Sequence, residues 1–211
     1  MTSVTMGTLA RFVRRLRNGR PIVVVSGLPR SGTSMMMQML QAGGLEILTD
    51  AVRTADGSNP KGYLEFEAVK DLDKGPPPPW LAGARGKAVK IVSSLVRWLP
   101  EGHDYRVIFM RRNLDEVILS QNKMLADRGS HPDVAQNDRV KHLYQAHVED
   151  TLRLLRGRRS VSMLVVDYSE ALARPVDTAR QIGRFLQAGL DVDRMAAAAD
   201  PNLYRNRSSA G

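Results

Sequence analysis

The chain has 211 residues, of which 43% are apolar and 25% charged, a composition typical of globular rather than disordered proteins. It contains no cysteine, which excludes disulfides and thiolate metal sites and fits a cytoplasmic location. Lysine and arginine exceed aspartate and glutamate by nine, which favours an anionic ligand. Aromatic residues are only 5% and do not alternate with basic ones, so we expect no nucleic-acid partner.

The first 20 residues combine a basic and an apolar face. The arginines are Arg11, Arg14, Arg15, Arg17 and Arg20, and the apolar residues are Leu9, Phe12, Val13 and Leu16. This pattern predicts a short amphipathic helix that either touches a membrane surface or packs its apolar face on the domain. We prefer packing on the domain.

Short β-branched runs alternate with amphipathic stretches along the rest of the chain. We expect strands over 22–25, 88–92, 105–110 and 161–166, and helices over 33–41, 114–126, 134–155 and 176–186. This alternation predicts one α/β domain over 1–211, in three layers, with helices on both faces of a mainly parallel sheet.

Glycine and proline interrupt the pattern between residues 49 and 87, where only 63–72 is a candidate for a short helix. Irregular segments of this length are commonly lids or binding loops, so we expect the acceptor side of a site here. Residues 200–211 form a basic tail.

The segment Gly27–Ser34 joins the first expected strand to the first expected helix. It has the G-x-x-x-x-G spacing of a P-loop, so backbone N–H groups and the positive end of the helix dipole would face one phosphate. A nucleoside triphosphate loop carries lysine after the second glycine, whereas Thr33 and Ser34 follow Gly32 here. The cation lies inside the loop instead, as Arg30.

The run Pro29, Arg30, Ser31, Gly32, Thr33, Ser34 resembles the 5′-phosphosulfate loop of the sulfotransferase family. These enzymes use 3′-phosphoadenosine 5′-phosphosulfate (PAPS) and share a P-loop-like α/β fold. Their second motif is an arginine after a central strand, with a serine eight positions later, both contacting the 3′-phosphate. Arg112 and Ser120 match that spacing, and Arg111 is the alternative if the register differs by one.

Looser similarity to a bacterial branch of the family covers 59–65, 110–124 and 200–207. The last stretch adds Arg205 and Arg207 as candidate cofactor contacts. The carboxyl-terminal Arg-Lys-Gly motif and the usual histidine base of the aryl and steroid enzymes are absent. The resemblance therefore implies another acceptor: a small molecule, carbohydrate or lipid bearing a hydroxyl or amine.

Sulfuryl transfer requires stabilisation of the leaving phosphate and a proton acceptor, and it requires no metal. Arg30 is the candidate cation. Glu65 is the first candidate base, because it belongs to the expected acceptor loop, and Asp50 is the second. Structural roles for both carboxylates stay open, and His147 falls on the apolar stripe of its helix, where a core role is favoured.

Two other functions remain open at this stage. A kinase or NTPase is one, because Met163–Asp167 has the form of a Walker B strand ending in aspartate. A catalytically silent nucleotide-binding protein of the same fold is the other. The missing loop lysine argues against the kinase.

Overall fold

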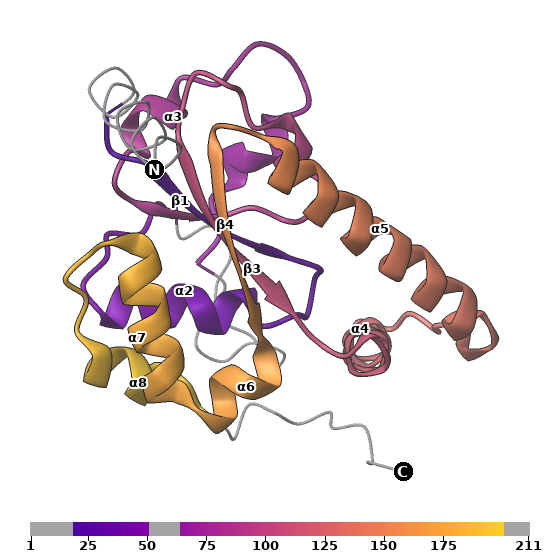
Figure 1. Ribbon diagram of the computed structural model, residues 1–211. Coiled ribbons are helices and arrows are strands. Elements are labelled where there is room, and N and C mark those ends of the chain that lie inside the picture. The colour runs from indigo at the N-terminus through magenta and orange to yellow at the C-terminus, as the bar shows by residue number, and fades with distance from the viewer. Residues whose placement is uncertain (1–18, 51–63, 201–211) are drawn as a thin grey trace, which may run out of the picture.

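The computed structural model describes residues 19–50 and 64–200 (Figure 1). The expected amino-terminal helix, most of the 59–65 stretch, and the tail with Arg205 and Arg207 lie outside the described residues.

A four-stranded parallel sheet forms the centre of the molecule, with strand order β2-β1-β3-β4. The strands are β1 (Ile22–Gly27), β2 (Ala88–Lys90), β3 (Tyr105–Arg111) and β4 (Val161–Asp167). All three pairings are parallel, and Ile22 lies opposite Tyr105 while Tyr105 lies opposite Val161. The expected α/β class and all four expected strands are confirmed.

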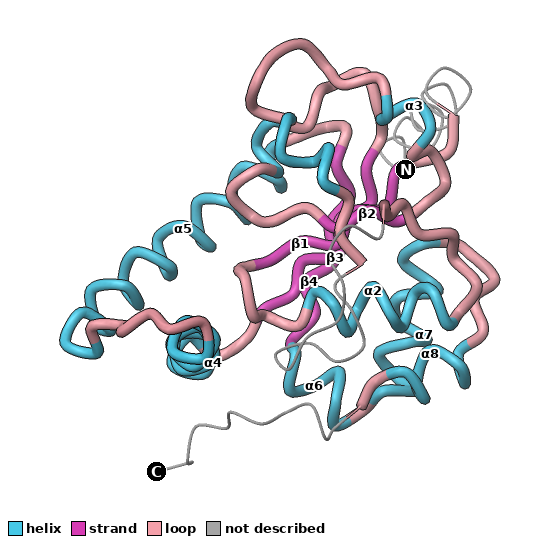
Figure 2. Tube along the Cα trace, turned by 180° about the vertical axis from the view of Figure 1, so that it is seen from behind, coloured by secondary structure: helices cyan, strands magenta, loops and turns pink. Residues whose placement is uncertain are grey.

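Helices cover both faces of this sheet, as Figures 1 and 2 show from opposite sides. The α-helices are α2 (Thr33–Ala42), α3 (Trp80–Gly83), α4 (Leu114–Asp127), α5 (Asn137–Gly157), α6 (Tyr168–Ala173), α7 (Pro175–Leu186) and α8 (Val192–Ala198). Three 3-10 helices are η1 (Glu67–Asp71), η2 (Val96–Trp98) and η3 (Val134–Gln136).

Alternate residues of β1 enter two separate cores, as expected for a strand buried on both faces. Val23 and Val25 pack with α2, α6, α7 and α8, whereas Ile22 and Val24 pack with α3, α5 and the two 3-10 helices η1 and η2. The resulting three layers leave the carboxyl ends of the strands, and the loops after them, along one edge.

Several expected helices differ in detail. The helix expected over 134–155 is divided into η3 and α5, and only 67–71 of the expected 63–72 helix forms, as a 3-10 turn. Helix α7 matches the expected 176–186 helix and ends at Leu186, where Gln187 adopts a left-handed conformation. The short helices α3, α6 and α8 were not expected, because so few turns depend on packing more than on local pattern.

No helix in the described part of the chain is long and apolar enough to span a bilayer.

Candidate nucleotide site

The phosphate loop follows β1 directly and ends where α2 begins. Gly27 and Gly32 have φ angles of 152° and 98°, which disfavour other residues. A Cβ on Gly27 would lie 2.6 Å from the Met110 carbonyl oxygen, so a side chain has no room there. Helix α2 has no acidic residue in its first turn and no side-chain cap, so carboxylates do not offset its positive end.

Two features of the loop suit an anionic ligand. The Ser31 hydroxyl oxygen is buried and has no hydrogen-bond partner among the described residues. Buried hydroxyls are normally paired, so a ligand oxygen would satisfy this one. Arg30 adopts a left-handed conformation, with a φ of 71°, a strained geometry common at functional sites.

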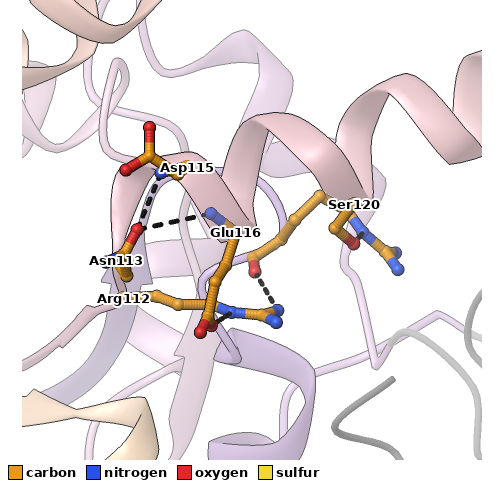
Figure 3. Close-up of polar contacts among 6 residues, drawn as sticks. Arg112, Asn113, Asp115, Glu116 and Ser120 are labelled. Atoms are coloured by element: carbon orange, nitrogen blue, oxygen red, sulfur yellow. Dashed lines mark hydrogen bonds and ion pairs between the residues drawn. The ribbon is translucent and has the colours of Figure 1, made fainter. Parts of the chain in front are cut away.

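Arg112 follows β3 and turns its guanidinium into the phosphate loop (Figure 3). Its Nη1 donates to the Arg30 carbonyl oxygen at 3.1 Å, and its Nε donates to a Glu116 carboxylate oxygen at 2.9 Å. The two side chains are only 8% and 5% exposed. The charge of Arg112 is therefore held in place inside the protein, next to the loop that the sequence identified.

Ser120 joins the same group from the second turn of α4. Its hydroxyl accepts a hydrogen bond of 3.0 Å from Arg30 Nε. The structure thus brings together three predicted residues from two distant parts of the chain: Arg30 in the loop, and Arg112 and Ser120 at the start of α4. Ser120 and Glu116 are both buried, so the polar face of α4 is enclosed where it meets the loop.

Asn113 caps α4, because its side-chain oxygen accepts from the backbone N–H groups of Asp115 and Glu116 at 2.8 and 3.4 Å. Glu116 stands three residues after Asn113, which is the spacing of a capping box. Its carboxylate instead pairs with Arg112, since a buried guanidinium needs an anionic partner more than an exposed helix end does.

Arg111, the neighbouring alternative, points elsewhere. Its Nε and Nη2 donate to the two carboxylate oxygens of Asp167 at 2.7 and 2.8 Å, in a partly exposed pair that joins the ends of β3 and β4. The geometry favours Arg112 as the arginine of the site. Asp167, the candidate Walker B aspartate, is therefore paired with Arg111.

The structure places Glu65 beside Lys90, a residue that the sequence analysis did not select. Lys90 ends β2, and its Nζ lies 3.0 Å from a Glu65 carboxylate oxygen and 3.1 Å from Ser34 Oγ. The two side chains are 14% and 26% exposed. Because β2 lies beside β1, the end of β2 places this ammonium group at the first turn of α2.

Asp50, the second candidate base, has a structural contact. Its carboxylate accepts from the backbone N–H of Glu67 at 2.6 Å, at the start of η1. Its backbone N–H and the Thr49 hydroxyl both donate to the Glu65 carbonyl oxygen, at 3.4 and 2.8 Å. These bonds fix the Glu65 backbone, so they favour Asp50 as a residue that positions Glu65.

Tyr168 is a further residue that the sequence analysis missed. Its ring lies against Gly32, where a Cβ would come within 2.3 Å of Cδ2, and the Arg112 guanidinium stacks 4.6 Å from its centroid. Burial raises the pKa of the Tyr168 hydroxyl, although Arg112 and Arg30 oppose this. The phenol therefore stays neutral and supports both the loop and the arginine.

Ser93 and His147 connect the loop to α5. The Ser93 backbone N–H donates to the Gly27 carbonyl oxygen at 3.1 Å, and the buried Ser93 hydroxyl lies 2.8 Å from His147 Nε2. Burial, followed by the charge of Arg97, lowers the pKa of His147. The expected core role of His147 is supported in part, because the imidazole is half-buried and bonded to a buried hydroxyl.

The lowered pKa of His147 predicts a loss of stability in acid. The unfolded chain takes up a proton near pH 6.5, whereas the folded imidazole resists it, so stability is complete above that pH and falls below it. We expect His147→Gln to reduce the slope of unfolding free energy against pH between about 6.5 and 5. Urea unfolding at several pH values measures this slope. The exposed His142→Gln is the control, and equal slopes in both variants would contradict the prediction.

The chain has the fold of a P-loop-like α/β domain, and similar folds occur among solved structures. One is mouse sulfotransferase SULT7A1 complexed with PAP, with a TM-score of 0.50, 15% identity, and coverage of 89% of this chain and 66% of that one. Another is retinol dehydratase in complex with androsterone and inactive cofactor PAP, with a TM-score of 0.50, 16% identity, and coverage of 87% and 65%. The chain thus spans slightly less than two thirds of the length of each of these two proteins.

A sugar kinase from Janibacter sp. HTCC2649, unliganded, has a TM-score of 0.40, 17% identity, and coverage of 86% of this chain and 99% of that chain. No family model matches the chain, and no curated protein matches its sequence.

Proposed function

We propose that this chain is a sulfotransferase that moves the sulfuryl group of PAPS to an acceptor hydroxyl or amine. The observation that carries the proposal is the convergence of Arg30, Arg112 and Ser120 beside the glycine-framed loop. PAPS carries a phosphosulfate at its 5′ end and a phosphate at its 3′ end, so its binding site requires a positive group near each end. The fold shared with the PAP complexes of SULT7A1 and retinol dehydratase supports the same reading.

The 5′ end of the nucleotide would lie on the loop and the start of α2. Backbone N–H groups from Gly32 to Ser34 and the Ser31 hydroxyl would donate to its oxygens, as helix amino termini commonly do for phosphates. Arg112 and Ser120 would hold the 3′-phosphate, with Glu116 and Tyr168 fixing the direction of the guanidinium. Arg30 lies between the two ends, because it belongs to the loop and contacts Ser120.

Bound PAPS supplies the sulfuryl group, and negative charge develops on the bridging oxygen as its bond to sulfur breaks. Lys90 is well placed to stabilise that charge, because its ammonium group already contacts Ser34. Arg30 was the candidate for this role, and in the structure its side chain bonds to Ser120 instead. We therefore assign Lys90 to the leaving oxygen, together with the α2 N–H groups.

Glu65 would accept the proton of the acceptor. Its carboxylate is held by Lys90, so the base lies close to the proposed site of transfer, where the acceptor oxygen would attack sulfur on the side opposite the leaving oxygen. The acceptor would be a small molecule, carbohydrate or lipid that enters near the described 64–72 segment.

A transfer assay with isotopically labelled PAPS and cell extract tests the function. Labelled products identified by mass support it. Saturable Mg²⁺-dependent ATP binding without affinity for PAP would indicate a kinase or NTPase. PAP binding without any labelled product would indicate a silent nucleotide-binding protein.

The two adjacent arginines give a sharp test of the nucleotide site. Arg112→Ala should weaken PAP binding by about 10- to 100-fold, because it removes a charge-assisted contact worth about 1.5–3 kcal/mol. Arg111→Ala should change the affinity by less than about threefold, because its guanidinium is paired with Asp167. Calorimetric titration with PAP measures both, and equal losses would contradict the assignment.

A similar pair of substitutions distinguishes the two candidate bases, Glu65 and Asp50. Glu65→Gln should lower the transfer rate by about 10²- to 10⁴-fold, as expected for loss of a general base, while PAP affinity stays near normal. Asp50→Asn should have a smaller effect, because its contact with the Glu67 N–H serves the backbone. Single-turnover rates with saturating PAPS measure this difference. A larger loss in Asp50→Asn would make Asp50 the base.

A further inference from the structure

The edge of the sheet opposite the nucleotide site carries a row of arginines. Because all four strands are parallel, residues just before each strand lie at the same edge. Arg20 precedes β1, Arg85 precedes β2, and Arg158 and Arg159 precede β4. A Cβ built on Gly19 would lie 3.3 Å from the Arg85 side chain, and one on Gly86 would lie 3.1 Å from the Arg20 side chain, so Arg20 and Arg85 are neighbours.

Arg97 and Trp98 extend this row on the α5 side. Arg158 fixes their loop, since its guanidinium donates to the carbonyl oxygens of Leu99 and Arg97 at 2.9 and 3.1 Å. Trp98 is nevertheless 53% exposed, and it is the only aromatic residue among the large exposed apolar side chains of the described chain. A fixed backbone thus presents an indole to solvent beside arginines. We call the six residues the amino-edge patch: Arg20, Arg85, Arg97, Trp98, Arg158 and Arg159.

The exposed arginines of the patch form no ion pairs with described residues, whereas some exposed arginines elsewhere do. Arg180 pairs with Asp177 and Arg194 with Asp191 on the two helices of the other face. Within residues 19–50 and 64–200, by contrast, no ion pair is formed by the exposed arginines 20, 85, 97 and 159. Glu101 and Asp104 are the carboxylates next to this edge in sequence. These two carboxylates lie on the same edge, because they precede β3, which lies between β1 and β4. Five arginines therefore outnumber two carboxylates there, and the patch is net positive.

We infer that the amino-edge patch binds the surface of an anionic lipid bilayer. Clustered arginines are attracted to anionic headgroups, and an exposed tryptophan inserts at the level of the headgroups. An RNA partner fits less well, because single-stranded binding uses several stacking aromatics and this edge presents one. The seven residues of β4 place the patch roughly 20 Å from the nucleotide edge, so docking leaves the site open.

Vesicle co-sedimentation tests this inference with the full chain. Wild-type protein should bind phosphatidylcholine vesicles containing 30% phosphatidylserine, lose that binding as NaCl rises, and ignore pure phosphatidylcholine. The triple substitution Arg20→Gln, Arg85→Gln, Arg159→Gln should weaken binding by about 100-fold, at roughly a factor of five per charge. Trp98→Ala should abolish the blue shift of tryptophan emission on binding.

A matched control has the same change in net charge on the opposite face: Arg180→Gln, Arg184→Gln and Arg194→Gln. It should bind vesicles within about threefold of wild type, and every variant retains residues 1–18. An equal loss in this control would overturn the inference, because binding would then follow net charge alone. So would binding to phosphatidylcholine, or an effect of the patch arginines on binding of single-stranded RNA but not of vesicles. Circular dichroism and thermal melting show that each variant is folded, and PAP affinity should remain unchanged in the patch variant.

Discussion

Replacing Lys90 by alanine should lower the rate of sulfuryl transfer by about 100- to 1000-fold. Lys90 Nζ lies at Ser34, where the bridging oxygen would gain charge, and a preorganised donor at such a position contributes about 2.7–4 kcal/mol to the barrier. PAP should bind within about tenfold of normal, because the interaction strengthens mainly in the transition state. Single-turnover rates and calorimetric titration measure the two quantities.

Lys87→Ala is the matched control. Lys87 directly precedes the same strand, β2, but it pairs with the exposed Glu46. Its loss should therefore leave the transfer rate within about threefold of wild type. Lys90→Arg keeps the charge and should retain more activity than Lys90→Ala. A rate for Lys90→Ala within threefold of wild type would show that Lys90 only holds Glu65.

Glu116→Ala should reduce the free energy of unfolding by about 3–5 kcal/mol. The substitution leaves the Arg112 guanidinium buried without its carboxylate, and an uncompensated buried charge is expensive. PAP should restore part of this stability, because its phosphate would neutralise the same guanidinium. Urea unfolding with and without PAP measures both effects.

The same helix offers a control for this prediction. Asp115 pairs with Lys141, and the two side chains are 57% and 40% exposed, so Asp115→Ala should cost less than about 1 kcal/mol. Removing both charges in Arg112→Met, Glu116→Leu should recover most of the stability lost in Glu116→Ala, although it removes PAP binding. Comparable losses in Asp115→Ala and Glu116→Ala would mean that burial of the pair contributes little.

Much of the site followed from local sequence. The β-branched run before Gly27 predicted a buried strand, and the glycine spacing predicted the loop that follows it. Arg112 and Ser120 were identified by their spacing after another strand, and the structure places both at Arg30. Each of these predictions depends on a strand, a turn and a helix that are adjacent in the chain. The strands and helices are confirmed, and the binding roles of Arg112 and Ser120 stay predictions.

Other residues of the site depend on contacts between distant segments. Lys90 reaches Ser34 only because β2 lies next to β1, and no local sequence pattern shows that these two strands are neighbours. Tyr168 depends on a close approach to Gly32 across the sheet edge. Its position directly after an apolar strand was a usable signal, since ligands in such sheets bind beyond strand ends. The pairing of Glu116 with Arg112 could not be predicted from local sequence, because the spacing of Glu116 from Asn113 also suits a helix cap.

The position of β1 inside the sheet also has a consequence for synthesis on the ribosome. Among the strands of the described residues, β1 is made first, yet both its neighbours, β2 and β3, come much later. At about 5–20 residues per second, the nascent chain carries β1 and the glycine loop for several seconds before Tyr105–Arg111 is made. During that interval the valines of β1 have no strand to pair with and are a target for chaperones. Codon choice between residues 27 and 105 should therefore affect the yield of folded protein more than codon choice after residue 167.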